Sequence, residues 1–289
     1  SGNFSRLTHN PKHSFRLKFK EEYGKSKLEF PIFPTSPVDE YDTLTLRTGH
    51  NQGWATGIAD TDMLRDQHAR DIQGFDPAQS VSDGNHVHVY LNGKYWGIYF
   101  LSERPDDAFG AEHWGGAKEE YDAFKGLSAG GSTQAEMIGG NRTAWAAMYA
   151  LAAQDTSDPA VYQAIQQYAD IDQLIDYTIG TLYQGDIDGP TGWINGPPNS
   201  LEPKNFYAMR RRHPDGRFRF YRWDSEFIFR NINEDVSERN GTENPGYLHY
   251  RLRLNPDYRR RFGDRVHRYF FNDGAFSVSA QQQFYLARA

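Results

Sequence analysis

The chain has 289 residues, 38% of them hydrophobic and 15% aromatic, so it can build a core in one large domain or in two lobes. Its net charge of -6 argues against general nucleic-acid binding, and we interpret the basic runs 210–212 and 259–261 as solvated surface. The absence of cysteine excludes disulfides, thiolate nucleophiles and Cys-ligated zinc. No apolar run reaches the roughly 18 residues that a membrane span needs.

A strand with one basic face is the first element that the sequence predicts. Residues 15–20 alternate between apolar and basic side chains, and Arg16 and Lys18 fall on the basic side. A period of two is typical of a half-buried strand, because successive side chains point to opposite faces. We therefore expect a cationic sheet face here, which could hold phosphate oxygens.

The next elements are two short strands, a helix and a hairpin. The strands are expected at 28–33 and 44–47, and the helix at 62–74. Asn92-Gly93 then separates two aromatic and β-branched runs, 86–91 and 94–101, which predicts a two-residue turn because both central residues need positive φ.

Helices dominate the second half of the chain. They are expected at 143–153, 159–168, 171–183 and 258–271, with a strand pair at 206–211 and 218–223 between them. Glycine-rich stretches around residues 115, 130 and 139 are interpreted as loops. This order predicts an α+β fold with a possible bilobal split near residue 104.

Acidic residues flank the strand pair of the second half. Asp186 and Asp188 follow a helix, Asp224 and Glu226 follow a strand, and Asn205 enters the strand pair. Carboxylates and an amide at the ends of elements suit magnesium, which prefers hard oxygen ligands and keeps positions for phosphate. Together with the basic strand, they are the groups that phosphoryl transfer uses.

Each of these patterns also has an ordinary structural interpretation. Asp-x-Asp-Gly is common in turns, an acidic residue after a strand can be an exposed end, and basic residues alternating with Phe can be a solvated sheet face. Composition and spacing alone therefore predict only an α+β domain with an acidic cleft.

The order of several segments resembles the spore-coat-protein-H (CotH) kinase family. The segments are the hairpin Leu91-Asn92-Gly93-Lys94-Tyr95-Trp96-Gly97-Ile98-Tyr99, the strand Ser14-Phe15-Arg16-Leu17-Lys18-Phe19, the helix Leu64-Arg65-Asp66, the helix from Ile171 to Tyr177, the strands Lys204-Asn205-Phe206-Tyr207 and Tyr221-Arg222-Trp223-Asp224, and the tail from Leu254 to Phe262. The resemblance spans roughly residues 12–272.

This resemblance implies a bilobal atypical protein-kinase-like fold. Residues 1–104 would form a strand-rich nucleotide-binding lobe, and residues 105–289 a mainly helical catalytic lobe. Arg16 or Lys18 would meet ATP phosphates, and the segment from Phe100 to Glu103 would be the hinge that meets adenine through backbone groups.

The resemblance also implies roles for the acidic residues and for one lysine. Asp188 would be the catalytic base, with Asp186 as the second choice. Asn205 and Asp224 would hold Mg²⁺ or Mn²⁺, with Glu226 as a further ligand. Lys125 resembles a family lysine that meets nucleotide, and it is equally well interpreted as a surface residue. The implied activity is ATP-dependent phosphoryl transfer to a protein Ser or Thr hydroxyl.

Two departures from the family pattern concern the predicted site. Asp188 and Asn205 are 17 residues apart (205 minus 188), whereas the family places these residues close together. A long loop can fold outward without moving its ends, because loop entropy changes slowly with length. Glu226 stands where the family has Asp, one methylene longer, so we expect weakened metal geometry.

Other functions fit parts of the same sequence. The fold could transfer AMP to protein, or act as a non-catalytic surface or assembly module with contact residues such as Trp193. Asp188 and Glu226 could also serve a glycoside hydrolase if they stand about 5–10 Å apart. The family implies a protein partner, such as a coat or surface protein, and an outer location. The chain begins at Ser1 without Met, so we expect a trimmed or processed chain.

Overall fold

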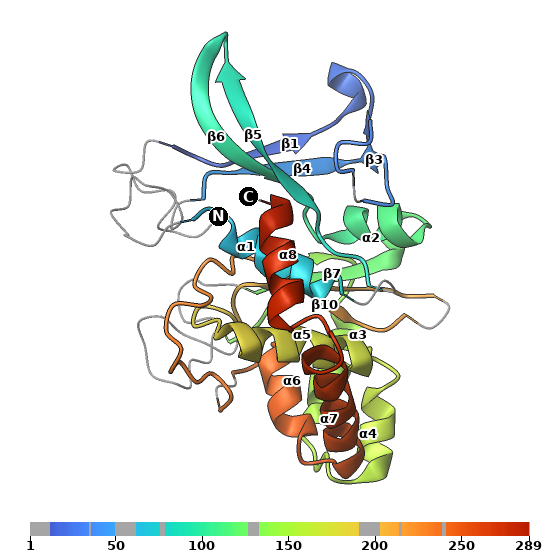
Figure 1. Cartoon of the computed structure of the whole chain (residues 1–289). Helices are drawn as coiled ribbons and strands as arrows, with labels where there is room; N and C mark the ends of the chain where they lie inside the picture. The colour runs from blue at the N-terminus through green and yellow to red at the C-terminus, as the bar shows by residue number, and fades with distance from the viewer. Residues whose placement is uncertain are drawn as a thin grey trace.

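The first predicted strand forms as β1 (Phe15–Lys18), which ends at Lys18 rather than at residue 20. The structure is a computed structural model, and it describes residues 12–34, 36–49, 62–75, 79–126, 133–190, 203–213, 216–238 and 241–288. Strands gather in the N-terminal part, drawn in blue and green at the top of Figure 1, and helices predominate in the C-terminal part. The predicted α+β class is confirmed.

An antiparallel four-stranded sheet forms most of the N-terminal part. Its order is β1-β4-β6-β5, with β4 (Thr43–Arg47), β5 (Gly84–Leu91) and β6 (Lys94–Ser102). Asn92 and Gly93 have φ values of 50° and 77°, which confirms the predicted two-residue turn between β5 and β6. A smaller pair, β2 (Leu28–Glu29) and β3 (Glu40–Tyr41), and a short helix at Glu21–Tyr23 complete this part.

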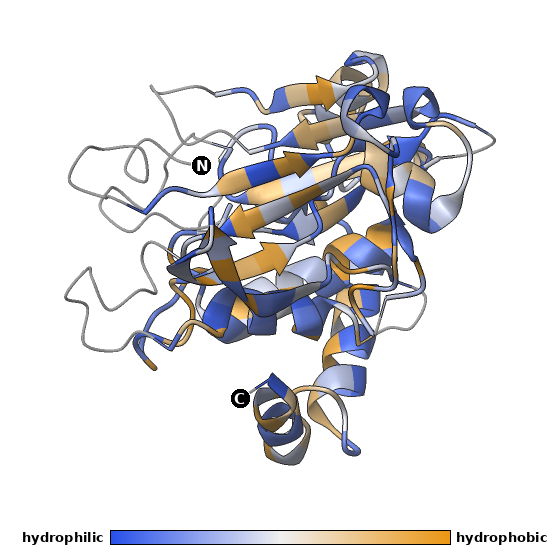
Figure 2. Ribbon diagram, turned by 90° about the horizontal axis from the view of Figure 1, so that it is seen from above, coloured by the Kyte–Doolittle hydropathy of each residue, from blue (hydrophilic) through white to orange (hydrophobic). Residues whose placement is uncertain are grey.

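The two faces of this sheet differ in chemistry. Leu44 and Leu46 of β4 pack with Phe15 and Leu17 of β1 in a hydrophobic core. Because side chains alternate along a strand, the residues between these apolar ones point the other way, and they include Arg16, Lys18 and Arg47. Figure 2 shows the same alternation of hydrophobic and hydrophilic residues along the strands. The predicted cationic face therefore exists, with Arg47 as an additional member.

Helix α1 (Arg65–Gln73) follows the first strands and begins later than the predicted residue 62. The Asp62 carboxylate accepts hydrogen bonds from the backbone N–H groups of Leu64 (3.0 Å) and Arg65 (3.3 Å), so this residue forms the entry turn instead of the first helical turn. Most of α1 is buried, polar residues included, which places it between larger elements rather than on the surface.

A second four-stranded sheet, of order β10-β9-β7-β8, lies in the C-terminal part. The predicted strand pair forms as β9 (Phe206–Arg211) and β10 (Arg219–Arg222). The interpretation of the glycine-rich stretch as loop was wrong at β8 (Glu136–Gly139), which pairs with the unpredicted β7 (Tyr121–Lys125). Helix α2 (Asp107–Trp114), also unpredicted, packs Phe109 onto this sheet.

The remaining helices, apart from the C-terminal one, contribute buried residues to the largest hydrophobic core. They are α3 (Thr143–Ala152), α4 (Pro159–Ile165), α5 (Ile171–Gln184), α6 (Pro245–Leu252), α7 (Pro256–Phe270) and α8 (Val278–Arg288). Trp145 and Leu174 are fully buried in this core. Across the described residues, no helix combines the length and the apolar character that crossing a membrane requires.

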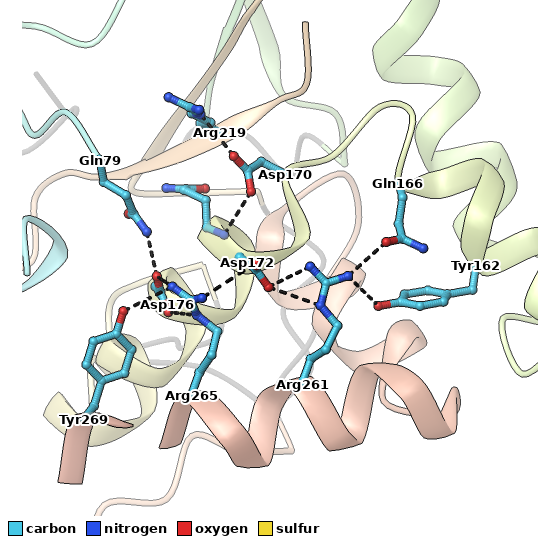
Figure 3. Close-up of polar contacts among 11 residues, drawn as sticks. Gln79, Tyr162, Gln166, Asp170, Asp172, Asp176, Arg219, Arg261, Arg265 and Tyr269 are labelled. Atoms are coloured by element: carbon cyan, nitrogen blue, oxygen red, sulfur yellow. Dashed lines mark hydrogen bonds and ion pairs between the residues drawn. The ribbon is translucent and has the colours of Figure 1, made fainter. Parts of the chain in front are cut away.

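Ion pairs fix α5 between α7 and the second sheet (Figure 3). Arg261 Nη2 lies 2.7 Å from Asp172, and Arg265 of α7 pairs with Asp176 of α5. Asp170 caps α5 and also pairs with Arg219 of β10 at 3.2 Å. Arg261, from one of the basic runs interpreted as solvated surface, is thus an ion-pairing residue, and α5 is held at the position from which the acidic loop departs.

Candidate active site

Three strand ends meet at one edge of the second sheet. Because β7 and β10 both run antiparallel to β9, their C-terminal ends lie beside the start of β9. This edge carries Lys125 at the end of β7, Asn205 just before β9 and Asp224 just after β10. The fold therefore brings together residues that are far apart in the sequence.

Asp188 is held at this edge by the residues that precede β9. Asn205 Nδ2 donates to the backbone oxygen of Asp188 at 2.6 Å and to its Oδ2 at 3.0 Å. The buried ammonium of Lys204 donates to Oδ1 at 2.5 Å. Burial raises the pKa of Asp188, and the Lys204 charge acts in the opposite direction. Both carboxylate oxygens are thus oriented, as a catalytic base requires.

Asp186 lies deeper than Asp188. Helix α5 ends at Gly185, whose φ of 55° turns the chain into the acidic loop. The side chain of Asp188 is 20% exposed, whereas Asp186 is 2% exposed as a residue. Burial raises the pKa of Asp186 to about 6, against the lowering effect of Arg222, and the Ser225 side chain hydrogen-bonds to it. This geometry favours Asp188 as the group that a substrate can reach.

The two predicted metal residues share an unusual backbone conformation. Asn205 has a φ of 55° and Asp224 a φ of 61°. Non-glycine residues rarely adopt positive φ, and Asn and Asp tolerate it best. Such conformations gather at functional sites, where the surrounding structure maintains them.

Arg47 joins the N-terminal sheet to the Asp224 loop. Its guanidinium donates to Asp224 and also to Asp66 of α1, and it lies 3.6 Å from Glu226 Oε2. Burial acts to lower the pKa of Arg47, but the carboxylates of Asp66 and Asp224 outweigh this effect and raise it. A cation on the sheet face is therefore buried against the acidic residues of the second sheet.

Helix α1 holds the same loop through Asp66. The backbone N–H of Ser225 donates to Asp66 Oδ1 at 2.8 Å, and Arg70 donates to Oδ2 at 2.7 Å. Although burial acts to raise the pKa of Asp66, the two arginines lower it. The carboxylate of Asp66 thus stays ionised, and it links β4, α1 and the residue that follows Asp224.

Glu226 is 8% exposed and lies beside Asp224. Burial, with the neighbouring Asp224 carboxylate, raises the pKa of Glu226 well above its usual range, although Arg47 acts to lower it. A buried carboxyl whose ionisation a neighbouring carboxylate disfavours is typical of a site that a cation can stabilise.

The predicted phosphate-binding residues Arg16 and Lys18 lie on the correct sheet face but do not reach the acidic cluster. Arg16 Nη2 pairs with Asp106, the cap of α2, at 3.1 Å. The side chain of Lys18 is exposed and makes no hydrogen bond or ion pair with the residues that the structure describes. The basic residue that meets Asp224 is instead Arg47.

Glu103, at the end of the predicted hinge segment, makes hydrogen bonds within the protein. Its carboxylate accepts from the backbone N–H of Asp83 (2.9 Å) and contacts His113 Nε2 (2.9 Å). Its own backbone N–H donates to Asp83 O, and its carbonyl accepts from Ser82 Oγ. Adenine would have to compete with these bonds, so we expect Glu103 to shape the segment rather than to contact the base.

Lys125 lies at the edge that carries the acidic cluster. Its ammonium pairs with Glu136 of β8 at 3.0 Å, and the side chain is 28% exposed. The register places Lys125 opposite Tyr207, two residues beyond Asn205. The lysine is therefore close to the site in the sheet, with an acidic partner of its own.

Two residues of the site had no role in the sequence prediction. Arg47 ends the predicted strand at 44–47, and alternation alone would have placed it on the face opposite Leu44 and Leu46. Lys204 precedes Asn205 in the predicted strand segment, and nothing in the local pattern assigns it a role. Trp193, a predicted contact residue, lies outside the described residues.

The side chains at this site fit a magnesium ion whose remaining coordination positions are filled by phosphate and water oxygens. No group of three or more His, Asp or Glu side chains suited to a metal occurs in the described part of the chain. Magnesium is usually bound by one or two carboxylates, with phosphate and water oxygens completing its shell. Asp224 and the Oδ1 of Asn205, which accepts no hydrogen bond from described residues, would supply such a partial set.

The chain matches a known protein family. The family model described as CotH kinase protein matches residues 1–282, almost the whole chain, and this confirms the predicted resemblance. No curated protein matches the chain.

Proposed function

Because the chain belongs to the CotH kinase protein family, we propose that it is a kinase that transfers the γ-phosphate of ATP to a protein Ser or Thr hydroxyl. One observation carries this proposal. The two ends of the connection between α5 and β9 bring Asp188 and Asn205 to one sheet edge, where Asp224 arrives from the loop after β10. Arg47 contacts Asp224 from the other sheet. Acid, amide and cation in one place are the groups that phosphoryl transfer uses.

Asp188 is the proposed base. It accepts or orients the proton of the acceptor hydroxyl as the oxygen attacks phosphorus, while the bond from phosphorus to the β-phosphate oxygen breaks. Lys204 favours the ionised form of Asp188, against the effect of burial on its pKa, through its charge and its 2.5 Å hydrogen bond. Asn205 fixes the direction in which the carboxylate points.

Asn205 and Asp224 are the proposed ligands of Mg²⁺ or Mn²⁺, with Glu226 beside them. The ion, when bound, neutralises phosphate charge. Arg16 and Lys18 lie on the same sheet face as Arg47 and are the proposed source of positive charge for the phosphates, which requires them to turn toward the site, since neither contacts the acidic residues of the site. Residues 1–104 and 105–289 would then be the two lobes of a kinase-like fold, with the nucleotide between them.

The test is incubation with γ-labelled ATP, Mg²⁺ or Mn²⁺ and a candidate acceptor protein, with autophosphorylation measured first. We expect phosphoryl incorporation by the native chain and a loss of at least about 100-fold in Asp224→Asn. Asp264→Asn, which changes an exposed acid of α7, is the matched control. Incorporation that persists in Asp224→Asn would remove this residue from the mechanism. Mass spectrometry separates an added phosphoryl group from an added AMP.

One observation favours a second candidate, a binding module without catalysis. Asp224 Oδ1, an oxygen that would face the metal ion, accepts a hydrogen bond from Arg47. If this pair persists with nucleotide present, the metal cannot use that oxygen. MgATP would then fail to raise the melting temperature, because only a ligand that binds the folded state stabilises it. A clear upward shift would instead support the kinase.

A further inference from the structure

Helix α8 returns from the helical part of the molecule to α1 and to the N-terminal sheet. Figure 1 shows it in red beside α1, with the chain end close to the base of β5. None of its residues is buried, so hydrophobic burial does not hold it in place. Its attachment depends instead on a few specific contacts, the strongest of which comes from Arg288.

Arg288 connects two elements of the N-terminal part. Its guanidinium donates to both carboxylate oxygens of Asp71 on α1, at 2.8 and 2.9 Å. It also donates to the backbone oxygen of Gly84 (3.0 Å) and to Asn85 Oδ1 (3.1 Å) at the start of β5. Two parallel bonds from one guanidinium to one carboxylate are strong and directional.

The carboxylate of Asp71 depends on this arginine. Its side chain is 8% exposed, and Gln67 Nε2 donates to it at 2.5 Å. Gln67 supplies a hydrogen bond but no charge. Without Arg288, α1 would carry a nearly buried negative charge with no other cation paired to it among the described residues, which is strongly unfavourable.

The other contacts of α8 are sparse. Gln281 Oε1 lies 3.0 Å from His68 Nε2, and the rings of Phe284 and Phe75 are 4.4 Å apart. Val278 and Leu286 are 74% and 73% exposed, and they border a pocket of about 630 Å³ between α8, α1 and Phe229. A helix attached in this way can detach without opening a core.

Helix α8 contacts α1, and α1 also holds the Asp224 loop of the candidate active site. Asp66, five residues before Asp71 on α1, accepts from Arg47 and from the backbone N–H of Ser225. Arg47 in turn donates to Asp224. Ion pairs and hydrogen bonds therefore connect Arg288 to Asp71 at one place on α1, and Asp66 to Arg47 and the proposed metal ligand at another, with the helix itself between them.

We propose that Arg288 is a positioning residue for the reaction, which acts through Asp71 to set α1 and hence Asp66, Arg47 and Asp224. Docked α8 supports the active arrangement, and release of α8 lowers phosphoryl transfer. The effect on activity depends on the proposed function, whereas the effect on α1 does not. The family match ends at residue 282, before Arg288, so family membership does not predict this role.

The test uses the full chain and two measurements. Hydrogen–deuterium exchange without nucleotide should show protection at α1 and at residues 222–228 lowered by about tenfold in Arg288→Gln. Arg260→Gln, which removes an exposed arginine paired with Asp264 on α7, should leave exchange unchanged. Arg288→Lys should restore part of the protection, because a lysine keeps the charge but loses the paired bonds.

The second measurement is phosphoryl transfer by the same variants. In Arg288→Gln we expect kcat to fall by about tenfold with the KM for the acceptor unchanged. Unchanged exchange at α1 would overturn the inference whether or not the native chain is active, and looser α1 with unchanged kcat would overturn the positioning role. If Arg288→Gln does not fold, Phe284→Ala weakens the same docking and takes its place. An inactive native chain would count against the proposed function, and hydrogen–deuterium exchange would still test whether Arg288 holds α1.

Discussion

The side chain of Asn205 donates a 2.6 Å hydrogen bond to the backbone oxygen of Asp188, although 17 residues separate the two in sequence. The same amide nitrogen lies 3.0 Å from the Asp188 carboxylate. The two residues therefore meet despite the insertion between them, as expected when lengthening a loop costs little entropy. This contact orients the proposed base, and it makes Asn205 a sensitive position.

Replacing Asn205 with glycine should separate orientation from folding. Glycine accepts the φ of 55° without strain and removes both side-chain hydrogen bonds to Asp188. We expect kcat to fall by about 100-fold, because a misdirected base loses near-attack geometry, with only a small change in melting temperature. Asn92→Gly, another positive-φ asparagine in the hairpin turn, should leave kcat unchanged. A rate within about threefold of the native chain would show that Asn205 is not needed.

Substitutions of Lys204 and Asp188 should have coupled effects on the free energy of unfolding. Lys204→Met leaves the Asp188 carboxylate largely buried without its nearby cation, so we expect a loss of about 2–4 kcal/mol at pH 7. Adding Asp188→Asn to the Lys204→Met variant should recover much of this loss, because the double variant no longer carries the unpaired charge. Urea unfolding of the two single variants and the double variant gives the coupling free energy. Additive effects would mean that the ion pair contributes nothing to the folded state.

Local sequence patterns predicted the elements whose own residues show a periodicity or a turn motif. The alternation at Phe15–Lys18 gave β1 and its basic face, and Asn92-Gly93 gave the hairpin turn. Strand β8 was missed because Gly139 is typical of loops, and only its pairing with β7 makes it a strand. Pairing between distant segments is not encoded in local spacing.

The candidate site was predicted in part, for a similar reason. Asp188, Asn205 and Asp224 stood out because acids and amides follow elements at loop ends. Arg47 did not stand out, since a basic residue at the end of a short strand is ordinary. Its importance comes from Asp66 and Asp224, which reach it through the fold. Lys18 was favoured by its strand face, but in the structure it remains exposed.

Asparagine substitutions should distinguish the two aspartates of the acidic loop. Asp188→Asn should lower kcat by about 1,000-fold if Asp188 is the base, and Asp186→Asn by less than about tenfold. Asp186→Asn should also stabilise the fold at pH 7.5, because the folded state otherwise has to ionise a buried carboxyl whose pKa is about 6. Initial rates and urea unfolding measure both effects. The opposite ranking of the two rates would move the catalytic role to Asp186.

Glu112 on α2 should give the protein a pH-dependent stability that is independent of the active site. Burial raises its pKa from 4.5 to about 8, with a smaller contribution from Glu103. The folded state then keeps a proton that the unfolded state loses, so the free energy of unfolding falls as pH rises from about 4.5 to 8. Glu112→Gln removes this titration, and its Oε1 can still accept the 2.6 Å hydrogen bond from the backbone N–H of Asp42. We expect the variant to be more stable than the native chain by about 2–4 kcal/mol at pH 9 and no more stable at pH 4. Glu119→Gln, at an exposed position nearby, is the control, and parallel pH curves for Glu112→Gln and the native chain would contradict the prediction.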